Sequence, residues 1–242
     1  MSETKSEWTR RNFVTAAATA VAGAGLLALK LDSWAQESAS ISLPKPRFDG
    51  KFSVEAALQK RRSIRTYAPS PLTLGDIGQL CWAAQGQNDP EGFRRTVPSA
   101  RGVYPLELYV AAGMVTGLQA GFYHYSSDAH SLQLVAPGDK RPDLDRMVMQ
   151  TWNHIATAPA VFVLSGSPSK MTGNEDLLVR RRALEFMWAE AGCAAQGFFL
   201  QAGARGLGST FVGGFDSKAA LGILGLAPTE EVLALLPVGK RM

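Results

Sequence analysis

Cysteine and histidine are scarce in this chain of 242 residues, which contains two cysteines and three histidines. Cys81 and Cys193 stand far apart, and the sequence has no CxxC motif or other metal-ligand spacing. This scarcity excludes the metal sites that are built from clustered Cys and His, so we expect no metal centre. Both cysteines fall in expected helices, and we interpret Cys81 as a small core residue.

Charge of either sign is also limited, because only 19% of the residues are charged and the formal net charge is +4. The basic residues cluster only at Arg61–Arg65 and Arg180–Arg182. Neither cluster alternates with aromatic residues, as a nucleic-acid-binding surface would, so we expect no DNA or RNA partner. With 46% hydrophobic residues, the chain is long enough to bury a core as one domain or a compact pair.

The sequence lacks an apolar run long enough to favour a membrane-spanning helix. Its uncharged stretch Val14–Leu29 is interrupted by glycine, follows Arg10–Arg11, and precedes small residues at Ser33–Ala35. The paired arginines, with Phe13 close behind, resemble a twin-arginine export signal. We expect residues 1–35 to be this signal peptide, the mature protein to be periplasmic, and membrane contact to occur only during export. The alternative is a short uncleaved anchor helix.

Periodicity and turn residues predict the elements that follow the signal. Residues 36–52 show no periodicity and are expected to form a linker or an extended arm. Helices are expected at Ser53–Lys60 with Ser53 as N-cap, Thr73–Gly86, Pro142–His154, Glu175–Ala204, and Lys218–Leu224 with Ser217 as N-cap. Strands are expected at Leu108–Ala112, Phe122–Tyr125, Leu132–Val135, Ala158–Leu164 and Val232–Val238, and a short one follows Gly206.

The helix expected at Glu175–Ala204 carries a broad apolar stripe. Its members are Leu184, Met187, Trp188, Ala191, Ala195, Phe198, Phe199 and Ala202. Packing within the domain explains such a stripe, and a helix–helix contact in a dimer is the alternative.

The sequence Arg61-Arg62-Ser63-Ile64-Arg65 places three guanidinium groups and a hydroxyl within reach of one ligand. Guanidinium groups match phosphate oxygens two at a time, and a serine hydroxyl adds a neutral donor, so the cluster suits a phosphate. The alternative is a basic helix end followed by a solvated turn. The adjacent Gly213 and Gly214 either let the backbone approach a ligand with its N–H groups exposed or form an ordinary tight turn.

Four separated motifs, taken together and in order, resemble the nitroreductase-like flavoprotein family, especially its branch related to thiazole/oxazole-forming peptide dehydrogenases. They are Arg61–Arg65, Pro98–Ala100 with Tyr104–Glu107, Glu190–Gln196, and Gly206–Phe215 with a closing Pro237-Val238-Gly239. The resemblance implies an α+β, nitroreductase-like fold over residues 53–242, in which helices sandwich a mainly antiparallel sheet. It further implies an intertwined homodimer with FMN at the interface.

The resemblance also implies roles for individual residues. The contacts to the FMN phosphate and ribityl chain would come from Arg61, Arg62, Ser63 and Arg65, completed by Lys240 and Arg241. The isoalloxazine ring would be contacted by Pro98, Ser99 and Ala100 of the partner subunit, by backbone N–H groups of Gly213 and Gly214 near N5, and by Gln150 at the pyrimidine edge. Two features depart from the branch: Arg101 follows Ala100 where glycine is usual, and no lysine matches the catalytic Lys-Tyr pair. We therefore do not expect peptide-azoline oxidation.

The function that the resemblance implies is an FMN-dependent oxidoreductase. It would work by ping-pong two-electron transfer, taking electrons from a small-molecule donor and passing them to a nitroaromatic or quinone acceptor. Because nicotinamide nucleotides are cytoplasmic, the donor of an exported protein need not be NADH or NADPH, and a quinol or an exported redox partner is the alternative. The alternatives are a flavin dehydrogenase that oxidises an organic substrate, a non-catalytic flavin-binding or electron-carrier module, and a helical interaction protein without a cofactor.

Overall fold

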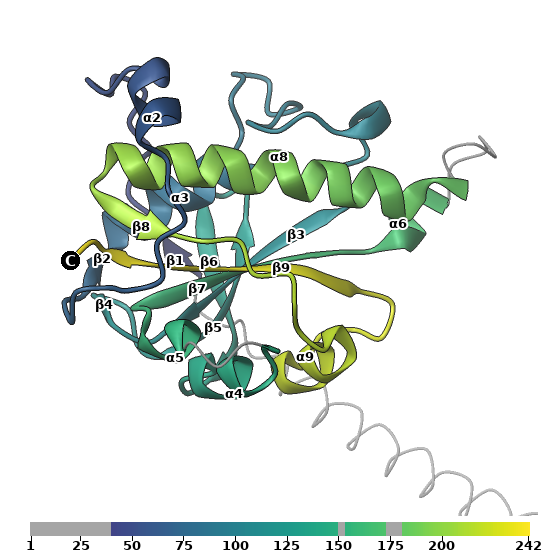
Figure 1. Ribbon diagram of the computed structural model, residues 1–242. Helices are drawn as coiled ribbons and strands as arrows, with labels where there is room; N and C mark the ends of the chain where they lie inside the picture. Colours follow the sequence, from purple (N-terminus) through teal and green to yellow (C-terminus); the bar gives the residue numbers. More distant parts are fainter. Residues whose placement is uncertain (1–39, 150–152, 173–180) are drawn as a thin grey trace, which may run out of the picture. The chain divides into compact units, whose positions relative to one another are not determined.

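A computed structural model describes residues 40–149, 153–172 and 181–242 of the chain (Figure 1). The strands are β1 (Ile41–Ser42), β2 (Leu72–Thr73), β3 (Leu106–Ala112), β4 (Val115–Thr116), β5 (Gly121–Ser126), β6 (Ser131–Pro137), β7 (Ala160–Gly166), β8 (Leu207–Ser209) and β9 (Glu231–Lys240). The helices are α2 (Val54–Lys60), α3 (Leu74–Gln85), α4 (Arg141–Arg146), α5 (His154–Thr157), α6 (Pro168–Thr172), α8 (Ala183–Ala204) and α9 (Ser217–Leu224), with a 3-10 turn at Ala100–Gly102.

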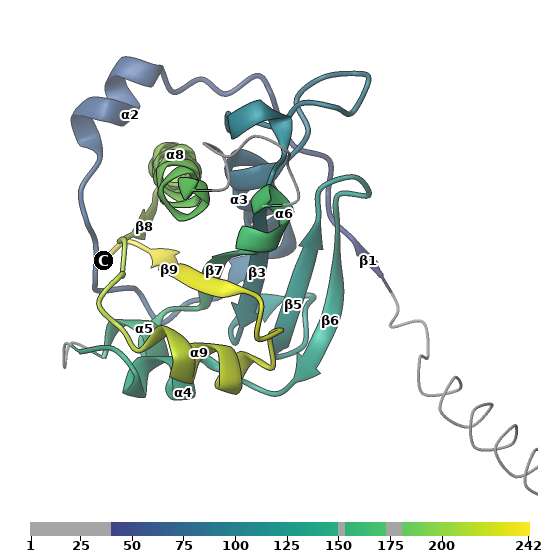
Figure 2. The same cartoon turned by 90° about the vertical axis from the view of Figure 1, so that its right-hand side faces the viewer.

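A seven-stranded sheet organises these elements in the order β1-β6-β5-β3-β7-β9-β8, and every neighbouring pair in it is antiparallel. The short strands β2 and β4 pair separately, in parallel. Helices α3, α6 and α8 cover one face of the large sheet, while α4, α5 and α9 cover the other (Figures 1 and 2). The expected α+β architecture, with helices on both sides of a mainly antiparallel sheet, is confirmed.

The interior strand β7 shows why the sequence specifies a sheet that is covered on both faces. All seven of its residues are buried. Phe162 and Leu164 belong to the core shared with α3 and α8, whereas Val161 and Val163 belong to the core shared with α4, α5 and α9. Since successive side chains of a strand point to opposite faces, two cores require a continuous apolar run. The interpretation of this run as a doubly covered strand is confirmed.

Local capping sets the starts of the first two helices. The Ser53 hydroxyl accepts the Ala56 N–H at 3.1 Å, and Thr73 forms a reciprocal capping box with Asp76. The predicted N-cap of α2 is thus confirmed, as are the start of the next helix at Thr73, which is its N-cap, and its end at Gly86. Cys81 is fully buried in α3, as expected.

The helix predicted over residues 142–154 is wrong, because two short helices, α4 and α5, stand in its place. Asn153, the N-cap of α5, has a φ of 52°, a left-handed conformation that Asn tolerates and that interrupts helical geometry. The Asp145 carboxylate of α4 accepts the Ile155 N–H at 3.0 Å and so caps α5 from outside. Periodicity alone does not reveal this contact between α4 and α5.

Two further details differ from or extend the predictions. The N-cap of α9 is Asp216 rather than Ser217, since the Asp216 carboxylate accepts the N–H groups of Lys218 and Ala219. Within the segment expected to be a linker or arm, β1 adds an edge strand to β6. The early part of the helix expected from Glu175 lies in residues 173–180, outside the described residues.

The apolar stripe of α8 is only partly used within the chain. Met187, Ala191 and Phe198 are buried in the core, whereas Leu184 and Trp188 stay 42% and 40% exposed. Intrachain packing therefore explains most of the stripe but not its N-terminal part. None of the helices in the described part of the chain is both long and apolar enough to span a membrane.

Candidate functional site

The segment Arg61–Arg65 leaves the end of α2 and runs along the edge of the sheet formed by β8 and the end of β9. Ile64 donates its N–H to Ser209 O at 2.9 Å, and Ala68 donates its N–H to Lys240 O at 2.9 Å. The C-terminus consequently lies beside β8 (Figure 1). The structure thus brings the basic segment Arg61–Arg65 close to the C-terminal residues Lys240 and Arg241.

Two glycines allow this close approach. A Cβ atom added to Gly208 would lie 2.6 Å from Ile64 Cγ2, and one added to Gly239 would lie 2.8 Å from Tyr67 Cβ. Neither distance is compatible with a side chain unless the backbone moves. Tyr67 in turn pairs with Arg241 through an isolated antiparallel bridge. Gly208 of β8 and Gly239 of β9 therefore allow the residues that follow α2 to pack closely against these two strands.

Two of the gathered cations also serve the fold. Arg62 Nη1 donates to Gln59 O at 2.9 Å and to Arg61 O at 2.8 Å, so this side chain caps the end of α2. Nη1 makes both of these bonds, and neither involves the N–H groups of Nε or Nη2. Arg241 Nε donates to Leu207 O at 2.9 Å. The alternative of a basic helix end thus describes part of what Arg62 does.

Buried hydroxyls lie beside the same segment. Ser209 pairs with Ser63 through a parallel bridge. Ser209 Oγ and Thr210 Oγ1 are buried and have no hydrogen-bond partner among the described residues. An unsatisfied buried hydroxyl costs roughly 1–3 kcal/mol. Because protein atoms enclose both oxygens, they do not face a ligand site. A phosphate, with several acceptor oxygens, suits the nearby cations Arg61, Arg62, Arg65, Lys240 and Arg241.

Gly213 and Gly214 lie in the segment of residues 212–215, which bonds both to β9 and to Met149. Val212 exchanges backbone hydrogen bonds with Leu235 of β9 at 3.0 and 2.9 Å, and Met149 donates its N–H to Gly214 O at 3.0 Å. Neither Gly213 nor Gly214 has a positive φ, and a Cβ on Gly214 would meet nothing within 4 Å. The fold itself therefore does not require glycine at 214, which favours ligand approach over the tight-turn alternative. Gln150 lies outside the described residues, directly after Met149.

The loop at Pro98–Ala100 lies elsewhere on the same chain. Ser99 Oγ and the Ala100 N–H both donate to Glu190 Oε1 of α8, at 3.0 and 2.8 Å. Glu190 stands 14 residues before the end of α8 at Ala204, which is about 21 Å along a helix that rises 1.5 Å per residue. Within one chain, the structure does not bring this loop to the Arg61–Arg65 segment. The resemblance assigns the loop to the flavin of a partner subunit, and this separation is consistent with that expectation.

The model of the Nitroreductase family matches residues 58–240, a span that contains the glycine pair, the Pro98–Ala100 loop and the whole of Arg61–Arg65. The chain belongs to the nitroreductase family. A protein of Methanocaldococcus jannaschii named as a nitroreductase is 34% identical over 192 residues, which cover 79% of this chain and 93% of that relative.

Solved structures agree with this membership. A nitroreductase of Ralstonia eutropha JMP134 superposes with a TM-score of 0.72 at 27% identity, over 86% of this chain and 91% of that one. A chain of the Escherichia coli microcin synthetase complex McbBCD, solved with truncated pro-MccB17 bound, has a TM-score of 0.63 at 20% identity, over 88% of this chain and 81% of that one. At that identity, the second likeness shows the fold alone.

This nitroreductase-family chain also contains a polar cluster that sequence reasoning missed. His124 Nε2 lies 2.8 Å from Glu107 Oε2, and Lys170 Nζ forms an ion pair with the other carboxylate oxygen. Burial by itself would raise the pKa of Glu107, but hydrogen bonds and charge from His124 and Lys170 lower it to about 2. Sequence neighbours offer His124 no partner, because Glu107 lies 17 positions away. Only the pairing of β3 with β5 brings the two residues together.

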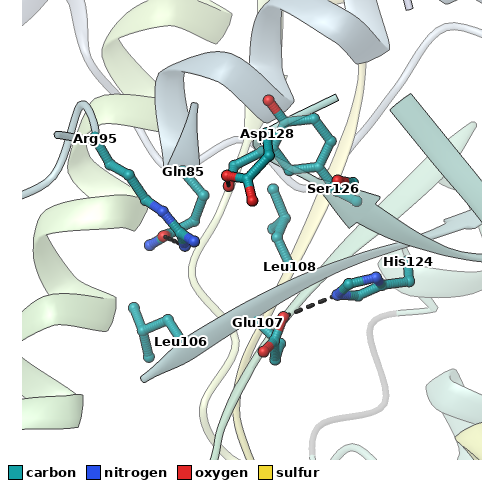
Figure 3. A pocket seen from close by; sticks show the side chains of 10 residues that line it. Gln85, Arg95, Leu106, Glu107, Leu108, His124, Ser126 and Asp128 are labelled. Atoms are coloured by element: carbon teal, nitrogen blue, oxygen red, sulfur yellow. Dashed lines mark hydrogen bonds and ion pairs between the residues drawn. The ribbon is translucent and has the colours of Figure 1, made fainter. Parts of the chain in front are cut away.

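Figure 3 shows Glu107 and His124 in the wall of a small pocket. The pocket has a volume of about 120 Å³ and is also lined by Gln85, Arg95 and Asp128. Ligand pockets usually measure roughly 300–1,000 Å³, so this space is too small for a flavin. Among the described residues, no group of three or more His, Cys, Asp or Glu is placed to hold a metal ion.

Proposed function

We propose that this protein is an FMN-dependent oxidoreductase. Members of the nitroreductase family are typically FMN-dependent, and the family supports an oxidoreductase. The observation that carries the proposal is the convergence of Arg61–Arg65 with Ser209 and the C-terminal Lys240–Arg241. A phosphate dianion is poorly accommodated unless several cations and hydrogen-bond donors surround it. The two ends of the chain supply these cations.

The residues divide into those that would hold the phosphate and those that would face the ring. Arg61, Ser63 and Arg65 would bind the phosphate and ribityl chain, with support from Lys240 and Arg241. The exposed backbone of Gly213 and Gly214 would offer N–H donors to the ring. When bound, FMN supplies two-electron hydride transfer at its N5 atom. The protein's own contribution is to bind and orient the cofactor and to leave one ring face open to substrates.

The proposed reaction is a ping-pong exchange in which a donor leaves before a nitroaromatic or quinone acceptor enters. Export to the periplasm would remove the protein from nicotinamide nucleotides, so we propose a quinol or an exported redox partner as donor. The deciding experiment mixes FMN-loaded protein, without oxygen, with NADH, NADPH, a soluble quinol or a candidate organic substrate. Bleaching of the flavin absorbance by the quinol, followed by reoxidation with a quinone or nitroaromatic, is the expected result.

Other outcomes of this experiment select other functions. Bleaching only by an organic substrate indicates a flavin dehydrogenase, and tightly bound FMN without turnover indicates an electron-carrier or flavin-binding module. Protein that stays colourless after incubation with FMN and removal of the excess contradicts the flavin proposal altogether.

Substitution of the basic segment tests the phosphate assignment separately. Arg61→Ala and Arg65→Ala are each expected to weaken FMN binding roughly 10-fold or more, because each removes a charge-assisted hydrogen bond that contributes about 1.5–3 kcal/mol. Fluorescence titration with FMN measures this change, and circular dichroism checks that the fold is intact. Lys140→Ala is the matched control, since it removes a positive charge at the N-cap of α4, outside the residues assigned to FMN. Unchanged FMN affinity in both arginine variants would show that the phosphate lies elsewhere.

We also propose that the protein is an intertwined homodimer. The separation of the Pro98–Ala100 loop from Arg61–Arg65 supports this, as do exposed apolar side chains on two helices. Val54 and Leu58 of α2 are 64% and 53% exposed, and Trp188 of α8 is 40% exposed. Light scattering should give twice the mass of the chain, and Trp188→Glu should shift the protein toward monomer and weaken FMN binding. A wild-type monomer that binds FMN at full affinity contradicts the dimer.

Export by the twin-arginine route is the remaining part of the proposal, and it rests on the sequence of residues 1–35. We expect the protein in the periplasmic fraction, with its N-terminus close after Ala35. Changing Arg10 and Arg11 together to lysine should retain the precursor in the cytoplasm. If the double variant reaches the periplasm as efficiently as the wild type, the signal is not of the twin-arginine kind.

A further inference from the structure

We infer that Glu190 is a positioning residue that holds the loop of residues 98–104 in the conformation needed to face the flavin. This inference rests on the proposed FMN function. It assigns a role to the motif Glu190–Gln196, for which neither the fold nor the basic segment accounts.

Glu190 holds this loop through a single oxygen atom. Its Oε1 accepts two hydrogen bonds from consecutive residues, one from Ser99 Oγ at 3.0 Å and one from the Ala100 N–H at 2.8 Å. The Glu190 side chain projects from the long helix α8 and is only 7% exposed. A buried acceptor on a rigid helix defines the position of its donors more narrowly than a solvated one.

Ser99 extends this contact across the loop. The same hydroxyl that donates to Glu190 accepts the Tyr104 N–H at 2.8 Å, so one oxygen ties both ends of the loop. The Tyr104 side chain is fixed as well. The Arg95 guanidinium lies 4.9 Å from the centre of the Tyr104 ring, and the backbone N–H of Arg95 donates to the Tyr104 hydroxyl at 3.2 Å. Glu190 is thus the point at which a closed hydrogen-bonded loop joins the core helix.

The loop needs such an anchor because its backbone is strained. Arg101 and Tyr104 have φ values of 58° and 50°, in the left-handed region that residues other than glycine rarely adopt. Strained backbone persists where surrounding contacts over-determine it, and it gathers at ligand-binding sites. If the anchor is lost, the loop is free to relax away from the conformation that would face the ring.

The acceptor geometry, rather than the negative charge, does the positioning. Burial raises the pKa of Glu190, and hydrogen bonds from Ala100 and Ser99 and the charge of Arg95 oppose part of this rise. Both donors use Oε1, so a proton carried on Oε2 leaves both bonds in place. Glutamine offers the same carbonyl oxygen without the charge, whereas leucine fills the space and accepts nothing.

The experiment compares Glu190→Leu and Glu190→Gln with the wild type, using the flavin spectrum, FMN affinity, kcat and KM. Glu190→Leu is expected to lower kcat/KM roughly 10- to 100-fold, the scale for a misplaced active-site group. We also expect a changed flavin absorbance band and an unfolding temperature close to that of the wild type. Glu190→Gln is expected to recover most of this loss. Glu185→Leu is the matched control, because Glu185 is on the same helix with a side chain that is 62% exposed.

The outcomes separate this inference from the proposed function. Wild-type protein that takes up no FMN overturns the proposed function, and with it the role of the loop. Wild-type protein that is active while Glu190→Leu keeps its spectrum, affinity and kinetics overturns the role of Glu190 alone. If Glu190→Leu does not fold, Ser99→Ala is the test, since it removes one of the two donors and the contact to Tyr104. Unaltered kinetics in a folded Ser99→Ala protein then overturn the inference.

Discussion

Replacing Glu107 with glutamine should destabilise the protein at neutral pH and make its stability less sensitive to acid. Glu107 lies in β3 with its side chain 25% exposed, and its carboxylate bonds to His124 of β5 and Lys170 of α6. This carboxylate thus links strand β3 to strand β5 and to helix α6. Glutamine keeps the size of the side chain and one acceptor oxygen, so the substitution removes chiefly the charge.

The pKa of Glu107 sets the size and the pH range of the effect. Burial opposes ionisation, yet the bonds from His124 and Lys170 lower the pKa from 4.5 to about 2. At about 1.36 kcal/mol per unit, that difference corresponds to roughly 3 kcal/mol of stability for the ionised carboxylate. Because the pKa is lower in the folded than in the unfolded chain, this contribution is complete above about pH 5.5. It is lost as the pH falls through 4.5 toward 2.

Urea unfolding followed by tryptophan fluorescence, at several pH values between 7 and 3, measures this contribution. We expect Glu107→Gln to lower the unfolding free energy by about 2–3 kcal/mol at pH 7 and by progressively less toward pH 3. FMN and protein concentrations are held constant, because ligands and partner subunits shift apparent stability by mass action. Glu185→Gln, whose ion pair with Arg182 is exposed, should change stability by less than about 1 kcal/mol. Parallel stability curves for Glu107→Gln and the wild type across this pH range would refute the reasoning.

Three further substitutions or measurements test the packing around the site. Gly208→Val should lower both the unfolding temperature and FMN affinity, since an added Cβ would lie 2.6 Å from Ile64 Cγ2, and a second change, Ile64→Ala, should restore part of each loss. Thr73→Ala should cost about 1 kcal/mol in urea unfolding, because it removes the side chain of the α3 capping box while leaving the flavin spectrum unchanged. Cys81 should not react with a thiol reagent until the protein unfolds, because burial in α3 raises the pKa of its thiol; rapid labelling of native protein at Cys81 would contradict this.

Elements that depend on short-range chemistry could be predicted from the sequence. Ser53 and Thr73 stand directly before their helices and cap them, and the continuous apolar run in β7 is enough to indicate a strand covered on both faces. Prediction was weaker where neighbouring residues compete for one role. Asp216 and Ser217 are both good N-caps, and only the backbone geometry shows that Asp216 takes the position. Likewise, nothing local shows that Asn153 adopts a left-handed conformation and divides a helix.

The candidate site was predictable as a set of motifs but not as an arrangement. The sequence shows a basic cluster, a glycine pair and two C-terminal cations, and their order identifies the family. It does not show that Ile64 would bond to Ser209, or that Arg62 would cap its own helix. These contacts depend on the path that the chain takes around the sheet.

By itself, then, the sequence determined the family, the approximate position of most helices and strands, and the residues suited to a phosphate and a flavin ring. Tertiary structure alone decided which of these residues meet. Ser99 meets Glu190 across 91 positions of sequence, and Glu107 meets His124 across 17. The physical reason is that propensity, capping and periodicity act over a few residues, whereas such pairs follow from strand order and from the packing of helices on the sheet.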